Sequence, residues 1–178
     1  KRPHVTAKFG VSLDGKISLL NGTSEWITSL DSRKDVQEER ASRSLIFTSS
    51  KTVLRDNPQM TIRDSILLDK IIKQPDIAII DRNLRIPINS KIFNDKSRLV
   101  YIFTNRKQSS KKFRSNVILV KISSDNNKIN IKECLRFLAK QDINSILLES
   151  GSNLMGSFLR ERLVDELILY FSPRMLGS

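Results

Sequence analysis

Residues 8–28 read KFGVSLDGKISLLNGTSEWIT, a stretch in which a strand runs into two glycine turns and a group of polar side chains. Apolar and polar residues alternate from Val5 to Val11, which is the period-two pattern of a half-buried strand. A turn at Asp14-Gly15 is expected to end this strand, because Gly adopts positive φ without steric penalty. α/β folds place ligand contacts where the chain leaves a strand. We therefore expect the floor of a site here, formed by Ser12, Lys16, Ser24, Trp26 and Thr28.

The rest of the chain predicts strands that alternate with helices. Nearly continuous apolar runs at 45–47, 76–80, 99–103, 117–120 and 145–148 indicate buried strands, and residues 164–171 predict the last strand. Helical patterns occupy 29–43, 131–139 and 154–162, with a brief helical turn that Asn57-Pro58 ends and a helix or loop over the surface at 64–75. This alternation predicts an α/β sandwich whose mostly parallel central sheet is flanked by helices.

Two further polar groups are candidates for a site. Strand 145–148 runs into Glu149-Ser150-Gly151-Ser152 and then a helix, a unit in which free N–H groups at the helix N-terminus can face an anion. This signal is weak, since the three-glycine dinucleotide fingerprint is missing and Gly-Ser turns are common. The other group contains Arg40, Thr52, Asp56 and Arg63.

Length and cysteine content restrict the class of protein. A chain of 178 residues suits one domain with its own core. The single cysteine, Cys134, cannot form an intramolecular disulfide, and its apolar helical neighbours indicate a small buried side chain rather than a nucleophile. No apolar run approaches the length of a membrane span, and the start KRPHV has no signal-peptide core. These features predict a cytoplasmic location and no membrane partner.

The formal charge of +12, from 31 basic and 19 acidic residues, leaves two classes of partner open. The chain could bind polyanions, or it could handle small anionic ligands on a basic surface. Its basic residues are spread over the whole length, which favours a diffuse field. A basic RNA-binding module would need exposed aromatic side chains for stacking, but most of the eight Phe and two Tyr lie in apolar runs. We therefore expect no nucleic-acid partner.

Several motifs, in order along the chain, resemble the reductase domain of the bacterial riboflavin-biosynthesis deaminase/reductase. They are Arg2-Pro3, VTAKFGVSLDGKIS at 5–18, SEWIT at 24–28, Arg40, TVLRDNP at 52–58, TIR at 61–63, LLESGSNLMGSFL at 147–159 and LVDELILYFSPRMLG at 163–177. Residues 64–75 and 105–130 carry little of the resemblance. It implies a dihydrofolate-reductase-like fold and one reductase domain over 1–178. Members of that family continue past the PRMLG equivalent, so it stays open whether the sheet lacks its last strands.

The resemblance also implies a reaction and partners. The family uses NADPH to reduce the ribosyl group of 5-amino-6-(5-phosphoribosylamino)uracil to a ribityl chain, so the expected partner is a small phosphorylated substrate. A reductase of the same fold acting on a pterin-like substrate is the alternative. A deaminase domain on this or another chain is a further expected partner, although the zinc motifs of such a deaminase are absent from this sequence. We also expect a homo-oligomer.

Hydride transfer suits the side chains that are present. The cofactor carries the reactive atom, so the protein needs no nucleophile or metal. The sequence has no metal-ligand cluster and no Cys/His or Ser/His/Asp grouping, and its only histidine, His4, lies beside Pro3 near the start. No catalytic residue is identified from the sequence.

By resemblance, the site residues fall into two sets. The cofactor set is Gly10, Trp26, Thr52, Asp56, Gly151, Ser152, Asn153, Leu154, Met155, Gly156 and Ser157. The substrate set is Ser24, Arg40, Met60, Arg63 and Glu149, with Lys16 as an additional phosphate or proton contact.

Structural roles are the alternatives at four of these places. Trp26 could plug the core, Arg40 could be a surface charge, and Glu149 could be the solvated end of a strand. The hydroxyls at 49–52 could only cap a helical turn.

Overall fold

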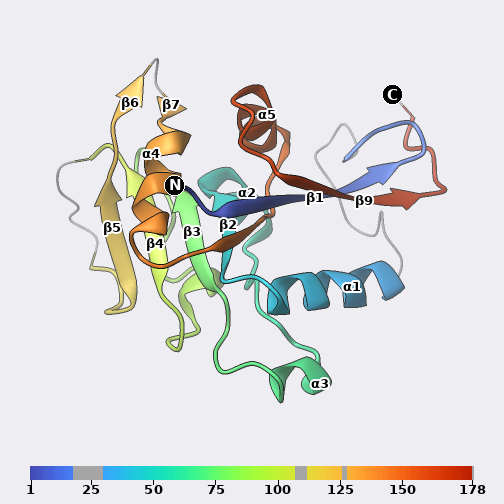
Figure 1. The fold of residues 1–178 in the computed structure, drawn as a ribbon, viewed down its shortest axis with the longest axis horizontal. Helices are drawn as coiled ribbons and strands as arrows, with labels where there is room; N and C mark the ends of the chain where they lie inside the picture. The colour runs from blue at the N-terminus through green and yellow to red at the C-terminus, as the bar shows by residue number, and fades with distance from the viewer. Residues whose placement is uncertain (18–29, 107–111, 126–127, 178) are drawn as a thin grey trace.

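The computed structural model describes residues 1–17, 30–106, 112–125 and 128–177. Within them, a seven-stranded sheet has the order β5-β4-β3-β2-β8-β1-β9, and each neighbouring pair of strands is parallel (Figure 1). The strands are β1 (His4–Ser12), β2 (Leu45–Ser49), β3 (Asp76–Ile80), β4 (Val100–Thr104), β5 (Val117–Lys121), β8 (Ser145–Leu148) and β9 (Glu166–Ser172). The predicted α/β class with a mostly parallel sheet is confirmed.

The helices of the described residues lie close to the predicted positions. They are α1 (Leu30–Ala41), α2 (Ser50–Asp56), α3 (Ser65–Leu68), α4 (Ile131–Ala139) and α5 (Ser152–Arg160), with a short 3-10 helix, η1 (Lys91–Phe93). A short antiparallel pair, β6 (Ser124–Asp125) and β7 (Lys128–Ile129), is not foreseen by the sequence pattern. Strands of two residues are too short to show a period.

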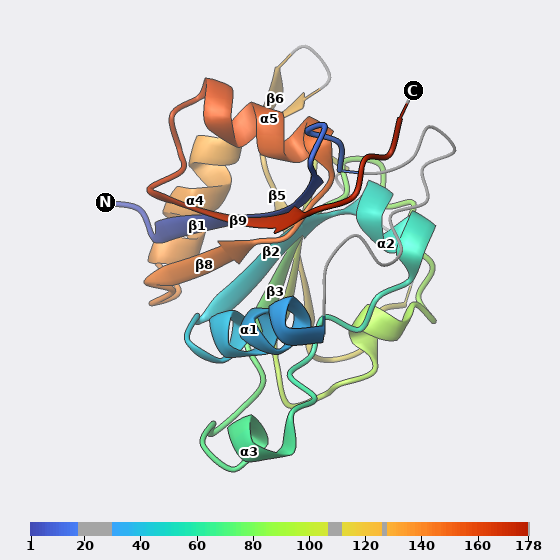
Figure 2. The same ribbon diagram turned by 90° about the vertical axis from the view of Figure 1, so that its right-hand side faces the viewer.

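The sheet separates two hydrophobic cores. Helices α4 and α5 cover one face (Figure 2), and Phe47, Phe103 and Phe158 pack together in the core on that side. Helix α2, η1 and their loops cover the other face, where Ile46 and Ile79 are fully buried. Helix α1 lies across the sheet from α5 and has no fully buried residue between 31 and 41. The central strands are thus covered on both faces, which leaves the ends of these strands as a place for a site.

Local sequence explains where the elements begin and end. The Asn130 side chain accepts a hydrogen bond from the Glu133 N–H and so caps α4, whose Cys134 and Leu135 are fully buried. Burial raises the pKa of the Cys134 thiol, which keeps it protonated. The expectation of a small buried side chain is confirmed.

The chain ends of the described structure meet at β1 and β9. These strands pair in parallel from Thr6 opposite Glu166 to Ser12 opposite Ser172, although more than 150 residues of sequence separate them. The predicted turn after β1 is confirmed, since Gly15 has a φ of 75° and donates its N–H to Ser12 O at 2.9 Å. This pairing places Gly10 of β1 beside Tyr170 of β9, next to the site.

The described residues contain neither a membrane-spanning helix nor a group of metal-ligating side chains. None of the helices there is long and apolar enough to cross a bilayer. The same residues contain no group of three or more His, Cys, Asp or Glu side chains placed to hold a metal ion.

Candidate active site

A pocket of about 1020 Å³ opens at the carboxyl ends of β1, β2, β3 and β8. Its lining comes from segments far apart in sequence: β1, α1, the β2–α2 turn, the loop after β3, the β8–α5 turn and Tyr170 of β9. In parallel α/β sheets the carboxyl ends of the strands are the usual place for ligands. The pocket therefore occupies the position that the polar residues after each strand predict.

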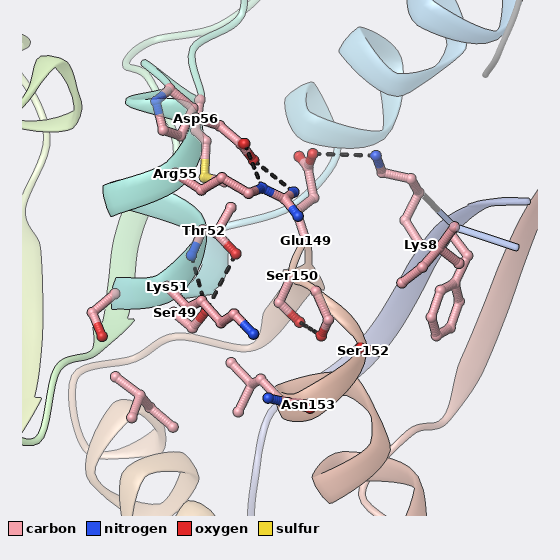
Figure 3. A pocket seen from close by; sticks show the side chains of 18 of the residues that line it. Lys8, Ser49, Lys51, Thr52, Arg55, Asp56, Glu149, Ser150, Ser152 and Asn153 are labelled. Carbon is pink, nitrogen blue, oxygen red and sulfur yellow. Dashed lines mark hydrogen bonds and ion pairs between the residues drawn. The ribbon is translucent and has the colours of Figure 1, made fainter. Parts of the chain in front are cut away.

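Glu149 lies at the centre of the lining, directly after β8, and only 7% of it is exposed. Arg40 Nε and Nη2 donate to the two carboxylate oxygens of Glu149 at 2.7 and 3.0 Å. Lys8 Nζ lies 3.4 Å from Oε2 of the same carboxylate (Figure 3). Burial by itself would raise the pKa of Glu149, but the charges of Arg40 and Lys8 outweigh it and lower the pKa to about 2. Glu149 is therefore ionised at neutral pH.

Arg40 connects this carboxylate to a neighbouring loop. Its Nη1 donates to Thr61 O at 3.0 Å, and its side chain is 12% exposed. Burial would lower the pKa of Arg40, yet the carboxylate of Glu149 raises it, so the guanidinium stays charged. Arg40 is not a surface charge and Glu149 is not a solvated strand end, so those two alternatives are wrong.

The β2–α2 turn forms one wall of the pocket. Ser49 Oγ accepts a hydrogen bond from the Thr52 N–H at 3.4 Å and lies 3.2 Å from Thr52 Oγ1, so Ser49 caps α2. The hydroxyls therefore do cap a helical turn, and the same turn also lines the pocket. Asp56 at the end of α2 accepts from Arg55 Nε at 2.6 Å.

The N-terminus of α5 faces α2 across the pocket (Figure 3). Gly151 is the N-cap residue and provides no side-chain hydrogen bond. The first backbone N–H groups of a helix have no partner within the helix, so those of Ser152 and Asn153 are suited to an anionic ligand. This geometry supports the weak sequence signal of a strand, a glycine turn and a helix.

The third wall follows β3. Asp81 is 1% exposed; its Oδ2 accepts from the Ile86 N–H at 2.9 Å, and its Oδ1 has no hydrogen-bond partner among the described residues. Arg82 and Arg85 also line the pocket, as do Lys51 and Arg55 of α2, so the lining carries several basic side chains.

Tyr170 closes the side between β9 and α1. Its hydroxyl donates to Asp35 Oδ2 at 2.5 Å, and burial together with this carboxylate raises the pKa of the phenol. The phenol is therefore neutral and acts as a hydrogen-bond donor to α1.

A second pocket of about 290 Å³ adjoins the main one and shares Arg40, Pro58 and Met60 with it. The loop 57–61, Arg63 and Lys91 complete its lining, in which no carboxylate is found among the described residues. The guanidinium of Arg63 and the ammonium of Lys91 have no side-chain partner in the described part of the chain. This pocket therefore attracts anions.

The structure brings most of the predicted site residues together. Those that line the main pocket are Gly10, Arg40, Thr52, Asp56, Met60, Glu149, Gly151, Ser152, Asn153 and Leu154.

Other predicted residues lie elsewhere. Met155 is 1% exposed and packs in the core under α5, and Gly156 and Ser157 lie outside the lining. Lys16 is also outside it and forms an ion pair with Asp14 at 3.9 Å. Ser24 and Trp26 lie outside the described residues.

The lining also contains residues that the sequence did not assign to a site, among them Lys8, Lys51, Arg55, Asp81 and Tyr170. Lys8 occupies a polar position in an alternating strand, a signal that reveals a face but not the pocket, and Tyr170 lies within the apolar run 167–171, which gives no site signal. Asp81 follows a buried strand directly, and that position could have identified it.

Comparison with known proteins identifies the family. The model of the RibD C-terminal domain matches residues 3–178. The chain is 35% identical over 184 residues to riboflavin biosynthesis protein RibD of Escherichia coli K12, covering 99% of this chain and 50% of that protein. It is 38% identical over 165 residues to 5-amino-6-(5-phosphoribosylamino)uracil reductase of Buchnera aphidicola, covering 88% of this chain and 79% of the relative.

Solved structures of RibD proteins resemble this chain in fold as well. The chain superimposes on the deaminase/reductase of Thermotoga maritima with a TM-score of 0.83 and 30% identity, over 99% of this chain and 46% of that one. Acinetobacter baumannii RibD gives a TM-score of 0.83 at 33% identity, over 99% and 48%. The chain thus spans about half the length of these relatives, and the expected dihydrofolate-reductase-like fold is confirmed. The family model and these relatives show that the chain belongs to the RibD C-terminal domain family.

Proposed function

We propose that residues 1–178 act as one reductase domain that uses NADPH to reduce the ribosyl group of 5-amino-6-(5-phosphoribosylamino)uracil to a ribityl chain. The observation that carries this proposal is that two anion-attracting regions, the α5 N-terminus with its basic rim and the second pocket, flank the ionised Glu149. Both expected ligands carry phosphate. The name of the Buchnera relative supplies the substrate.

The residues of the main pocket fit a dinucleotide. The uncapped N-terminus of α5 suits a pyrophosphate, and the unpartnered Asp81 Oδ1 suits a ribose hydroxyl. Lys51, Arg55 and Arg85 on the rim suit the extra phosphate that distinguishes NADPH from NADH. When bound, the nicotinamide supplies the hydride.

The substrate end lies around Glu149. Its carboxylate accepts hydrogen bonds only, which suits the ring N–H and amino groups of an aminouracil. Lys8 Nζ lies beside Glu149, and we assign it as the donor of the proton that the ribose ring oxygen takes when this oxygen leaves the anomeric carbon. Arg63 and Lys91 in the second pocket would hold the substrate phosphate.

A partner enzyme must deaminate the pyrimidine before this step. The Thermotoga relative is named as both deaminase and reductase, and the chain covers 46% of it. We propose that a deaminase domain, on this or another chain, supplies the substrate. The expected homo-oligomer stays a prediction.

Turnover with purified protein tests the proposal. We expect NADPH to be consumed only when the phosphorylated aminouracil is added, and a dihydropterin to give no reaction. Arg63→Lys should raise KM for the uracil substrate about tenfold or more and leave KM for NADPH unchanged, because an ammonium cannot replace a bidentate guanidinium. Equal losses for both ligands would show that Arg63 is structural.

A further inference from the structure

Arg98, in the loop before β4, is the largest fully buried side chain among the described residues and is 1% exposed. It lines neither pocket. Nη1 donates to Met60 O at 2.7 Å, and Nη2 donates to Gln59 O at 2.5 Å and to Ile92 O at 3.3 Å. One guanidinium therefore ties the loop 57–63 to η1, the two segments that line the second pocket.

Burying this cation is costly, and the structure offsets the cost only in part. Burial lowers the pKa of Arg98 to about 10, although Asp95 raises it, and the nearby charge of Arg40 lowers it further. The side chain is still protonated at neutral pH. Its Nε has no hydrogen-bond partner in the described residues, and no carboxylate there forms an ion pair with it. An apolar residue of similar size would pack here with less penalty.

The position of Arg98 fixes the direction of two peptide groups. A trans peptide points its C=O and its N–H in opposite directions. Because Arg98 binds the carbonyls of Gln59 and Met60, the N–H groups of Met60 and Thr61 point away from it. Neither N–H has an acceptor in the described part of the chain.

The conformation of the loop is also unfavourable for its sequence. Met60 has a φ of 52°, a left-handed backbone conformation that residues other than glycine rarely adopt. Arg40 holds the next carbonyl, Thr61 O, and the Gln74 side chain bonds both N–H and C=O of Ile62. Buried side chains therefore impose the backbone shape on this loop, and Met60 and Thr61, whose N–H groups point away from Arg98, both line the second pocket.

We infer that Arg98 is a positioning residue for the phosphate group of the substrate. It holds the Met60 and Thr61 amides in place as donors beside Arg63 and Lys91, without touching the ligand itself. Successive backbone N–H groups held in a concave turn form anion sites in other proteins. This inference rests on the proposed function for the identity of the ligand but not for its chemistry, which is that of a phosphate monoester.

The test uses ribose 5-phosphate and ribose as probes, with binding measured by calorimetry on the full chain. We expect wild-type protein to bind ribose 5-phosphate more tightly than ribose. Arg98→Met should raise the Kd for ribose 5-phosphate about tenfold or more, because the amides lose their orientation. The Kd values for ribose and for NADPH should stay unchanged. Arg114→Met is the matched control, since Arg114 is exposed and reaches the same region through Asn94, and should bind as wild type.

A second variant covers the case in which Arg98→Met does not fold. Arg98→Lys keeps the buried charge but cannot reach both carbonyls with one planar fork, so it should show the same selective loss to a smaller degree. A folded Arg98 variant that binds ribose 5-phosphate like wild type would overturn the inference. So would a folded variant whose affinity for NADPH falls as much as its affinity for ribose 5-phosphate. Failure of the proposed function gives a different result, because wild-type protein would then bind ribose 5-phosphate but consume no NADPH with the uracil substrate.

Discussion

At the scale of residues, the site depends on one buried carboxylate between two cations. Glu149 is buried after a strand that carries no polar residue between 146 and 148, so its charge is stable only because Arg40 and Lys8 lie against it. The three groups come from β8–α5, α1 and β1. Sequence reasoning could select Glu149 and Arg40 through resemblance, but Lys8 gave no signal beyond its polar place in an alternating strand.

The pKa of Glu149 gives a pH prediction. Its folded-state pKa of about 2 lies below the ordinary value of 4.5, so the unfolded chain binds the proton more readily. The carboxylate therefore contributes its full stability above about pH 4.5 and loses it as the pH falls toward 2. We expect denaturant midpoints to fall over that interval for wild type, with a flatter profile for Glu149→Gln.

A control separates this effect from general acid unfolding. Glu161→Gln removes an exposed carboxyl from the end of α5 and should follow the wild-type profile. If Glu149→Gln and wild type lose stability in parallel over the whole acid range, Glu149 is not held in the ionised form as described.

At the scale of elements, the β8–α5 turn joins the sheet to the proposed cofactor. Gly151 has a φ of −71°, which any residue can adopt, and a Cβ placed there would meet no atom within 4 Å. The fold does not require glycine at this position. The space beside Gly151 at the N-terminus of α5 is therefore open, as the proposed cofactor site requires.

Gly151→Val should leave the fold intact and weaken the binding of NADPH. The new side chain would occupy the pocket beside the free N–H groups of α5, so we expect the Kd for NADPH to rise about tenfold or more. Fluorescence titration gives the Kd, and thermal unfolding shows whether the fold is kept. Leu159→Gln, on an exposed position of the same helix, is the control. Unchanged NADPH binding by a folded Gly151→Val would remove the α5 terminus from the cofactor site.

The elements themselves were largely predictable from the sequence. Uninterrupted apolar runs such as residues 145–148 identify buried parallel strands, and Asn57-Pro58 marks the end of α2. The order of the strands in the sheet was not predictable, because the pairing of β1 with β9 joins segments that are far apart in the sequence. The second pocket was missed for the same reason, since Arg98 and Lys91 reach the loop 57–63 only in the folded structure.

At the scale of the whole molecule, the charge of +12 acts as a field on phosphorylated ligands. This field is screened over about 8 Å at physiological ionic strength. We expect kcat/KM to decline modestly as salt rises from low to physiological concentration.

A random RNA oligomer should bind weakly and should not displace NADPH. Submicromolar RNA binding at physiological salt, with no detectable NADPH binding, would favour the nucleic-acid class instead.

The central claim is that one pocket holds NADPH and the uracil substrate so that the hydride passes directly to the anomeric carbon. NADPH labelled with deuterium at the transferred position of the nicotinamide tests it most directly, with the product analysed by mass spectrometry and NMR. We predict one deuterium on the first carbon of the ribityl chain. A product without deuterium at that carbon, or no product from a folded protein that binds both ligands, would contradict the account.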